Sequence, residues 1–208
     1  LKHGVEADYV AREGSIFNVI PDVAFDIGAN FLVMGTHGKV GMQHVTGSFA
    51  WKVVTGSPVP VIVVQKKPFD KGYQNIVMNI DGTFQSKQKI NWAVYIANVF
   101  NSTVHLTVPQ EKDEFLANKI IGNLNQTKSI LQKNNINFTI KELSGANTGK
   151  MLESYADEIN ADLIMIITNP EKSTFILSPW DEQLLFNSAK IPVMGINPVD
   201  SFITVYRR

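Results

Sequence analysis

The fold is decided by residues 31–64, FLVMGTHGKVGMQHVTGSFAWKVVTGSPVPVIVV. The stretch opens with a continuous apolar run, 31–35, which is typical of a strand buried on both faces. Four glycines lie within residues 34–48, and a helical segment follows at 47–57. A second apolar run, 59–64, completes a strand–helix–strand unit. This pattern predicts two parallel strands joined by a right-handed crossover.

The same alternation continues outward in both directions. Upstream, residues 5–10 (VEADYV) predict a strand, and residues 15–29 predict an amphipathic helix in which Pro21 marks a kink or the true first turn. Downstream, strands are expected at 75–81, 102–108, 138–143, 162–168 and 191–196, and helices at 85–100, 113–133, 147–159 and 181–189. Alternation of this kind predicts a parallel sheet with helices on both faces.

The two halves of the chain superpose without a gap at an offset of 132 residues, from Ala29 to Ala161. Pro60-Val61 then falls on Pro192-Val193, and we interpret the match as an internal duplication. The first copy shows only the last three of its five strands, so the offset predicts on the order of 60 further residues upstream. We expect those upstream residues, rather than a second chain, to supply the two missing strands.

Composition argues against several classes of protein. Lys+Arg and Asp+Glu both total 19, so the net charge is zero and nothing indicates nucleic-acid binding. There is no cysteine, which excludes disulfides and thiolate metal sites and fits the expected cytoplasmic location. No apolar run reaches the length of a membrane span. No His/Asp/Glu cluster has transition-metal spacing, so no metal-binding residue is predicted.

The glycine-rich loop is the strongest candidate site. Gly35 follows a buried strand, and glycines let backbone N–H groups approach a ligand without interference from a Cβ atom. Gly47 and Ser48 stand at a helix N-terminus, where free amides and the helix dipole favour an anion. Parallel sheets bind ligands beyond the carboxyl ends of their strands. The loop therefore predicts phosphate binding, with a tight turn that binds nothing as the alternative.

The pattern resembles the second half of a universal stress protein domain, in MGTHG (34–38), GS (47–48) and PVPVIVV (58–64). Two copies in one chain resemble the tandem members of that family. The resemblance implies tandem α/β, Rossmann-like domains of the adenine nucleotide alpha-hydrolase-like type, each with a parallel five-stranded sheet of order 3-2-1-4-5. It divides the chain into the C-terminal half of a first domain (1–67), a linker (68–74) and a second domain (75–208).

The ATP-binding members of the family are similar to one another in a G-x2-G-x9-G-[ST] signature. This chain has G-x2-G-x8-G-S, one residue shorter. The resemblance implies a site for an adenine nucleotide, ATP with Mg²⁺, made by Met34, Gly35, His37, Gly38, Gly47, Ser48 and Phe49. It implies a binding protein of the stress response with no catalytic residue, and it leaves slow hydrolysis of bound ATP open.

The second copy has lost this signature. The offset places Ile167, Pro170, Pro179 and Trp180 at its four positions. Proline has no N–H to donate, so we expect no ATP in the second domain. Asp81 ends the strand 75–81 at a position that contacts adenine in the family. Without the glycine loop, we expect Asp81 to be a turn or capping residue instead.

The resemblance implies that the domains associate within the chain through their last strands, 59–64 and 191–196, and leaves a homodimer open. The alternative function is a nucleotide-independent structural or interaction protein of the same fold. In that case the aromatic residues of 174–186 form a partner surface, or, more simply, pack on their own core. A dedicated enzyme is disfavoured, because neither an SGGxDS phosphate loop nor an HxGH motif occurs in the chain.

Overall fold

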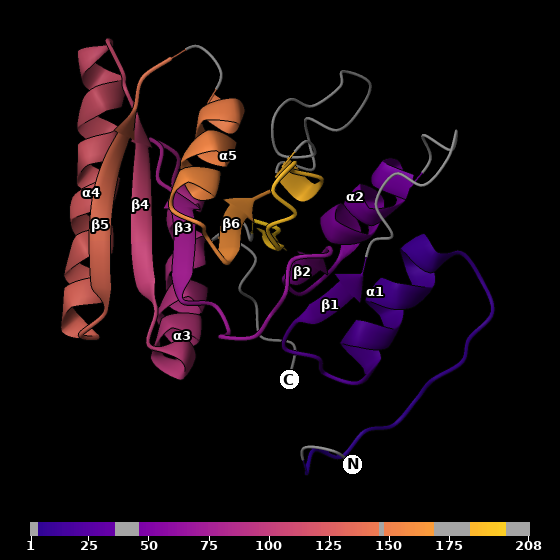
Figure 1. Ribbon diagram of the computed structural model, residues 1–208. Coiled ribbons are helices and arrows are strands. Elements are labelled where there is room, and N and C mark those ends of the chain that lie inside the picture. The colour runs from indigo at the N-terminus through magenta and orange to yellow at the C-terminus, as the bar shows by residue number, and fades with distance from the viewer. Residues whose placement is uncertain (1–3, 36–45, 146–147, 169–183, 199–208) are drawn as a thin grey trace.

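The computed structural model describes residues 4–35, 46–145, 148–168 and 184–198 (Figure 1). Its elements, in chain order, are α1 (Ile16–Asp26), β1 (Leu32–Gly35), α2 (Thr46–Gly56), β2 (Val61–Val64), β3 (Asn75–Asn79), η1 (Gln85–Lys89), α3 (Ile90–Phe100), β4 (Thr103–Pro109), α4 (Glu114–Lys133), β5 (Asn137–Leu143), α5 (Thr148–Glu158), β6 (Leu163–Ile167) and β7 (Val193–Ile196). The short 3₁₀ helix η1 runs directly into α3. The elements predicted between residues 75 and 168 are present with ends shifted by at most two residues. The helix predicted at 181–189 lies partly outside the described residues.

All seven strands join in one sheet of order β1-β2-β7-β6-β3-β4-β5. Neighbouring strands are parallel except for β2 and β7, which are antiparallel. The resemblance implied two five-stranded sheets. The structure instead has a single sheet, in which the second half contributes five strands in the order β5-β4-β3-β6-β7 and the first half contributes two.

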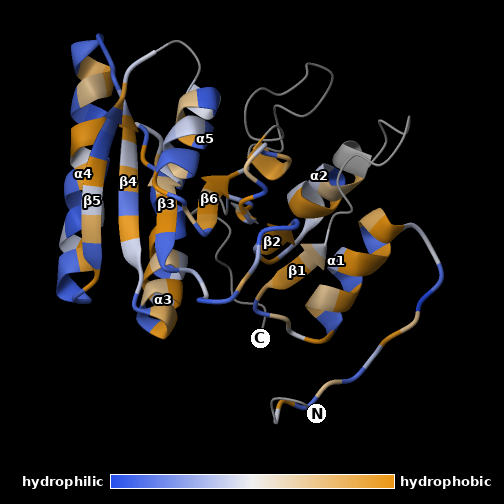
Figure 2. Ribbon diagram, in the orientation of Figure 1, coloured by the Kyte–Doolittle hydropathy of each residue, from blue (hydrophilic) through white to orange (hydrophobic). Residues whose placement is uncertain are grey.

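Hydrophobic residues run along the strands, and helices lie on both faces of the sheet (Figure 2). On one face, Ile76 and Met78 of β3 pack with residues of α3 and α4. On the other, Val77 packs with residues of α2 and α5. The three β3 side chains have no exposed surface. The apolar runs therefore became strands buried on both faces, as parallel sheets require.

The strand predicted at residues 5–10 is wrong. These residues form no strand, and Val5 and Tyr9 are 67% and 89% exposed. A strand is stable only when neighbouring backbone satisfies its N–H and C=O groups. In the implied order, two strands must lie between this segment and β1, and the described part of the chain contains none there. The guanidinium of Arg12 instead pairs with Asp26 of α1 at 2.9 Å.

The pairing of β2 with β7 joins the two halves, which confirms the predicted association through the last strands. Ile62 lies opposite Met194, flanked by the pairs Val61–Gly195 and Val63–Val193. The 132-residue offset equates Ile62 with Met194, so the pairing is symmetric about these two residues. A two-fold relation between the halves follows from this register.

Two amide side chains, one from each half, donate hydrogen bonds across this junction. Asn197 follows β7 and Gln65 follows β2, and the offset equates these positions. The Nδ2 of Asn197 donates to the carbonyl oxygens of Val54, Thr55 and Ser57 at 2.9, 3.0 and 2.7 Å. The Nε2 of Gln65 donates to the carbonyl of Leu185 at 2.9 Å. Each half thus satisfies backbone carbonyls of the other half, including those that the end of α2 leaves without helical partners.

The contacts of Asn197 predict that Asn197→Ala destabilises the protein. The substitution leaves three carbonyls without this donor, so the free energy of unfolding should fall by about 1–3 kcal/mol. Urea unfolding followed by circular dichroism measures the change. The control is Asn134→Ala, which removes one exposed hydrogen bond to Ile130. Equal effects of the two substitutions would contradict a fastening role for Asn197.

Candidate functional site

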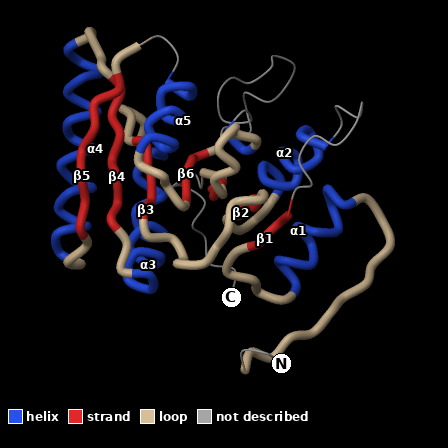
Figure 3. Tube along the Cα trace, in the orientation of Figure 1, coloured by secondary structure: helices blue, strands red, loops and turns tan. Residues whose placement is uncertain are grey.

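The candidate site begins at the carboxyl end of β1. Gly35 is the last residue of β1 and lies beside Val64, the last residue of the parallel strand β2. Residues 36–45 lie outside the described residues, and the chain re-enters as α2 at Thr46. α1 and α2 lie on the same side of these two strands (Figure 3). The glycine-rich stretch therefore connects a strand's carboxyl end to a helix N-terminus, the arrangement that favours anions.

Of the seven predicted site residues, two lie outside the described residues, and for two more the structure describes only the backbone. His37 and Gly38 lie outside the described residues, and of Gly47 and Ser48 only the helical backbone in α2 is described. Met34 is half-buried and packs against the core on the α2 side. Gly35 is exposed, and a Cβ there would meet no heavy atom within 4 Å. Packing within the described structure therefore does not require a glycine at position 35.

Phe49 has a visible structural contact. Its ring stacks on Phe17 of α1, with centroids 5.4 Å apart and planes inclined by 21°. The ammonium of Lys52 lies 5.1 Å from the centroid of the same Phe17 ring. Phe49 thus holds the first turn of α2 against α1, and its contact with a nucleotide stays a prediction.

The carboxyl end of β3, in the second half, is a closed turn. The Oδ1 of Asp81 accepts hydrogen bonds from the backbone N–H and the hydroxyl of Thr83, at 2.8 and 2.6 Å. The Nδ2 of Asn123 in α4 donates to the carbonyls of both residues at 2.7 and 2.9 Å. The prediction that Asp81 is a turn residue is confirmed.

Lys89, in the same region, is a residue that the sequence analysis missed. It ends η1, which packs against β6 and α4, and only 2% of its surface is exposed. Burial lowers the pKa of Lys89 to about 8, and the negative charge of Asp81 opposes that shift. No carboxylate in the described ranges lies within salt-bridge distance of its ammonium. The signal in the sequence is its helical spacing, since Lys89 stands four residues before the buried Ala93.

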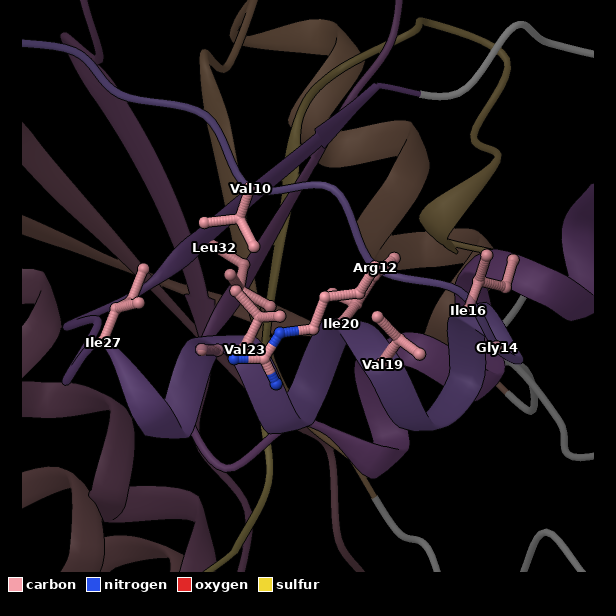
Figure 4. A pocket seen from close by; sticks show the side chains of 10 residues that line it. Val10, Arg12, Gly14, Ile16, Val19, Ile20, Val23, Ile27 and Leu32 are labelled. Carbon is pink, nitrogen blue, oxygen red and sulfur yellow. The ribbon is translucent and has the colours of Figure 1, made fainter.

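A separate cavity of about 310 Å³ lies between the N-terminal segment and α1 (Figure 4). It is lined mainly by apolar side chains, including Val10, Val23 and Leu32, with Arg12 across its opening. Its lining includes neither Gly35 nor any residue of α2. This cavity is therefore distinct from the glycine-rich loop.

Two further searches cover the described residues only. Within them, no three His, Cys, Asp or Glu side chains come together as a metal site would need. No helix among them is both long and apolar enough to cross a membrane. Neither finding adds a second candidate site to the loop after β1.

The fold and the loop define a doubly wound α/β protein with a candidate ligand site at the carboxyl ends of parallel strands. Residues 2–65 match the model of the Universal stress protein family. This match covers β1, the loop and both flanking elements α2 and β2. This segment of the chain is therefore similar to the universal stress protein family.

Solved structures extend the likeness to most of the chain. A universal stress protein from Archaeoglobus fulgidus DSM 4304 is 18% identical with a TM-score of 0.72, over 88% of this chain and 66% of its own. A putative universal stress protein from Pseudomonas aeruginosa UCBPP-PA14 is 15% identical with a TM-score of 0.63, over 89% of this chain and 69% of its own. A universal stress protein in complex with cAMP is 19% identical with a TM-score of 0.50, over 61% of this chain and 99% of its own. These identities show the fold, and the chain spans about two thirds of the two longer structures. No curated protein matches the chain.

The burial of Lys89 predicts an unusual dependence of stability on pH. The pKa of Lys89 is about 8 in the folded protein and 10.5 as the reference value. Between these values the unfolded chain holds a proton that the folded protein lacks, so stability should rise with pH from about 8 to 10.5. Lys89→Met should stabilise the protein at pH 7 by roughly 1–3 kcal/mol and remove this rise.

Urea unfolding of both proteins from pH 7 to pH 10 tests this. The control is Lys87→Met, since Lys87 is less buried and its ammonium donates to Gln126 at 2.6 Å. The same pH slope in the unaltered protein and the Lys89 variant would contradict a buried ammonium at this position.

Proposed function

We propose that the chain binds an adenine nucleotide, ATP with Mg²⁺, at the loop between β1 and α2, and acts in the stress response without being an enzyme. The observation that carries this proposal is the position of the loop. It leaves β1 at Gly35 and enters α2 at Thr46, so that it starts at a strand's carboxyl end and finishes at a helix N-terminus. The family match covers this unit in full.

The chemistry of the flanking residues supports an anionic ligand. Backbone amides in the first turn of α2 have no helical acceptor, so they are available to phosphate oxygens. Gly35 leaves open space where a side chain would stand, which allows a ligand to approach the backbone. The complex of a similar universal stress protein with cAMP supports the choice of an adenine nucleotide.

The second half does not offer an equivalent site in this proposal. Ile167 stands at the end of β6 where the first half has Gly35, and the Asp81 carboxylate is engaged by Thr83. We therefore propose at most one nucleotide per chain. We assign no catalytic residue, and slow hydrolysis and a cytoplasmic location stay predictions.

A nucleotide-independent interaction protein is the second candidate. The observation that favours it is the apolar surface around β1, where Val33 is 60% exposed. The aromatic stretch 174–186 falls mainly outside the described residues. Leu184 and Leu185, at its described end, are buried in the core. Their burial supports packing of this end on the protein's own core rather than a partner surface.

Calorimetric titration with ATP–Mg²⁺ tests the nucleotide proposal. We expect saturable binding with one site per chain, because Ile167 stands in the second half where the first half has Gly35. Gly47→Val should abolish binding by adding bulk at the N-terminus of α2. The matched control is Gly122→Val, an exposed glycine of α4 with open space around it, which should bind as the unaltered chain does. Absence of binding by the folded, unaltered chain would favour the interaction protein.

A further inference from the structure

Helix α2 begins at the loop of the proposed nucleotide site and ends against the second half of the chain. The Nδ2 of Asn197, just after β7, donates to the carbonyl oxygens of Val54, Thr55 and Ser57 at 2.9, 3.0 and 2.7 Å. Val54 and Thr55 lie in the last turn of α2, and Ser57 follows it. The last carbonyls of a helix have no partner within that helix. Asn197 therefore caps α2 from the other half.

The second half closes its corresponding segment in a different way. The 132-residue offset equates Thr55 with Asn187. The Nδ2 of Asn187 donates to the carbonyls of Leu184 and Ile191 at 2.9 and 2.7 Å, within the second half. The hydroxyl of Thr55 instead turns back into α2, to the carbonyl of Trp51 at 3.0 Å. Asn187 thus closes its own turn, whereas the end of α2 takes its amide donor from across the junction.

Asn197 is itself held in one orientation. The hydroxyl of Thr168, at the carboxyl end of β6, donates to the Oδ1 of Asn197. Thr168 is 1% exposed, and its N–H donates to the carbonyl of Ile196 at 2.9 Å. Because Oδ1 is engaged by a donor, the NH₂ group of the side chain is the part that faces α2. The hydrogen bonds therefore run without a gap from β6 through Asn197 to the end of α2.

The first turn of α2 is held by a different contact, in the first half. The ring of Phe49 stacks on Phe17 of α1, with centroids 5.4 Å apart. The eleven residues of α2 form one continuous helix between this stack and Asn197. If the carboxyl end is released, the helix can pivot about the stack, which redirects the amides at its N-terminus. Anion binding at a helix N-terminus depends on where those amides point.

We propose that Asn197 is a positioning residue of the nucleotide site, through which the second half sets the orientation of α2 and hence the affinity for nucleotide. The inference rests on the proposed function, since it concerns the same site. Coupling of this kind acts in both directions, so a bound nucleotide must also change the surroundings of Asn197. The second half thereby controls the nucleotide site without binding a nucleotide itself.

Calorimetric titration with ATP–Mg²⁺ tests the positioning role in variants that urea unfolding shows to be folded. Asn197→Ala should lower the affinity on the order of tenfold. Thr168→Val should lower it less, because it removes only the hydroxyl that orients Asn197. The matched control is Asn123→Ala in α4. It removes hydrogen bonds of the same kind, to the carbonyls of Asp81 and Thr83, and should bind as the unaltered chain does.

Nuclear magnetic resonance of the unaltered chain provides a test that needs no folded variant. The signal of the Asn197 side-chain amide should shift when ATP–Mg²⁺ saturates the site, while that of Asn123 should stay in place. A residue that only stabilises the fold would keep its signal unchanged. A stationary Asn197 signal in a chain that binds ATP would overturn the positioning role.

The titrations separate this inference from the nucleotide proposal on which it rests. If the unaltered chain binds ATP and both Asn197→Ala and Thr168→Val bind equally well, the positioning role is overturned and the nucleotide proposal stands. An equal loss of affinity in Asn123→Ala would also overturn it, because the effect would then follow from any loss of stability. If the folded, unaltered chain binds no ATP, the nucleotide proposal and this inference are both overturned.

Discussion

The antiparallel pairing of β2 with β7 is the interaction on which the rest of this structure depends. The first half contributes only β1 and β2 to the sheet, and a two-stranded sheet is marginally stable in water. Joined to β7, these strands become part of a seven-stranded sheet whose core crosses the junction. The contact is close, because a Cβ at Gly195 of β7 would lie 2.5 Å from the side chain of Val54 in α2. Glycine therefore lets α2 sit directly on the strand of the other half.

This junction also separates the loop after β1 from the closed turn at Asp81. Since β2 and β7 are the antiparallel pair, the strands of the first half point opposite to those of the second. The carboxyl end of β1, with Gly35, and the carboxyl end of β3, followed by Asp81, therefore lie on opposite sides of the sheet as measured along the strand direction. The two regions share no contact recorded in the described structure, so the closed turn at Asp81 imposes no constraint on the loop after Gly35.

The strands and helices of residues 75–168 could be predicted from sequence because each has its own periodic pattern and neighbours that satisfy it. Residues 5–10 have a similar pattern, yet Val5 and Tyr9 are exposed, because a strand also needs a partner that periodicity does not report. The union of the two halves into one sheet follows from the register of Ile62 with Met194, which no local pattern specifies. For the site, sequence reasoning identified Asp81 as a turn residue. It overlooked Lys89, because a periodic apolar pattern does not show that a lysine at its start is buried.

Lys89 shows how the second half differs physically from the first. An ammonium that is 2% exposed costs stability at neutral pH, and the carboxylate of Asp81 offsets only part of that cost. The turn at Asp81 holds that carboxylate through Thr83, and Asn123 of α4 holds the turn. The region beyond β3 is therefore occupied by the hydrogen-bonded Asp81 carboxylate and the buried ammonium of Lys89. Beyond β1, a Cβ at Gly35 would meet no heavy atom within 4 Å. An incoming phosphate would have to displace paired groups in the second half, whereas at Gly35 it would meet no described side chain that must first move.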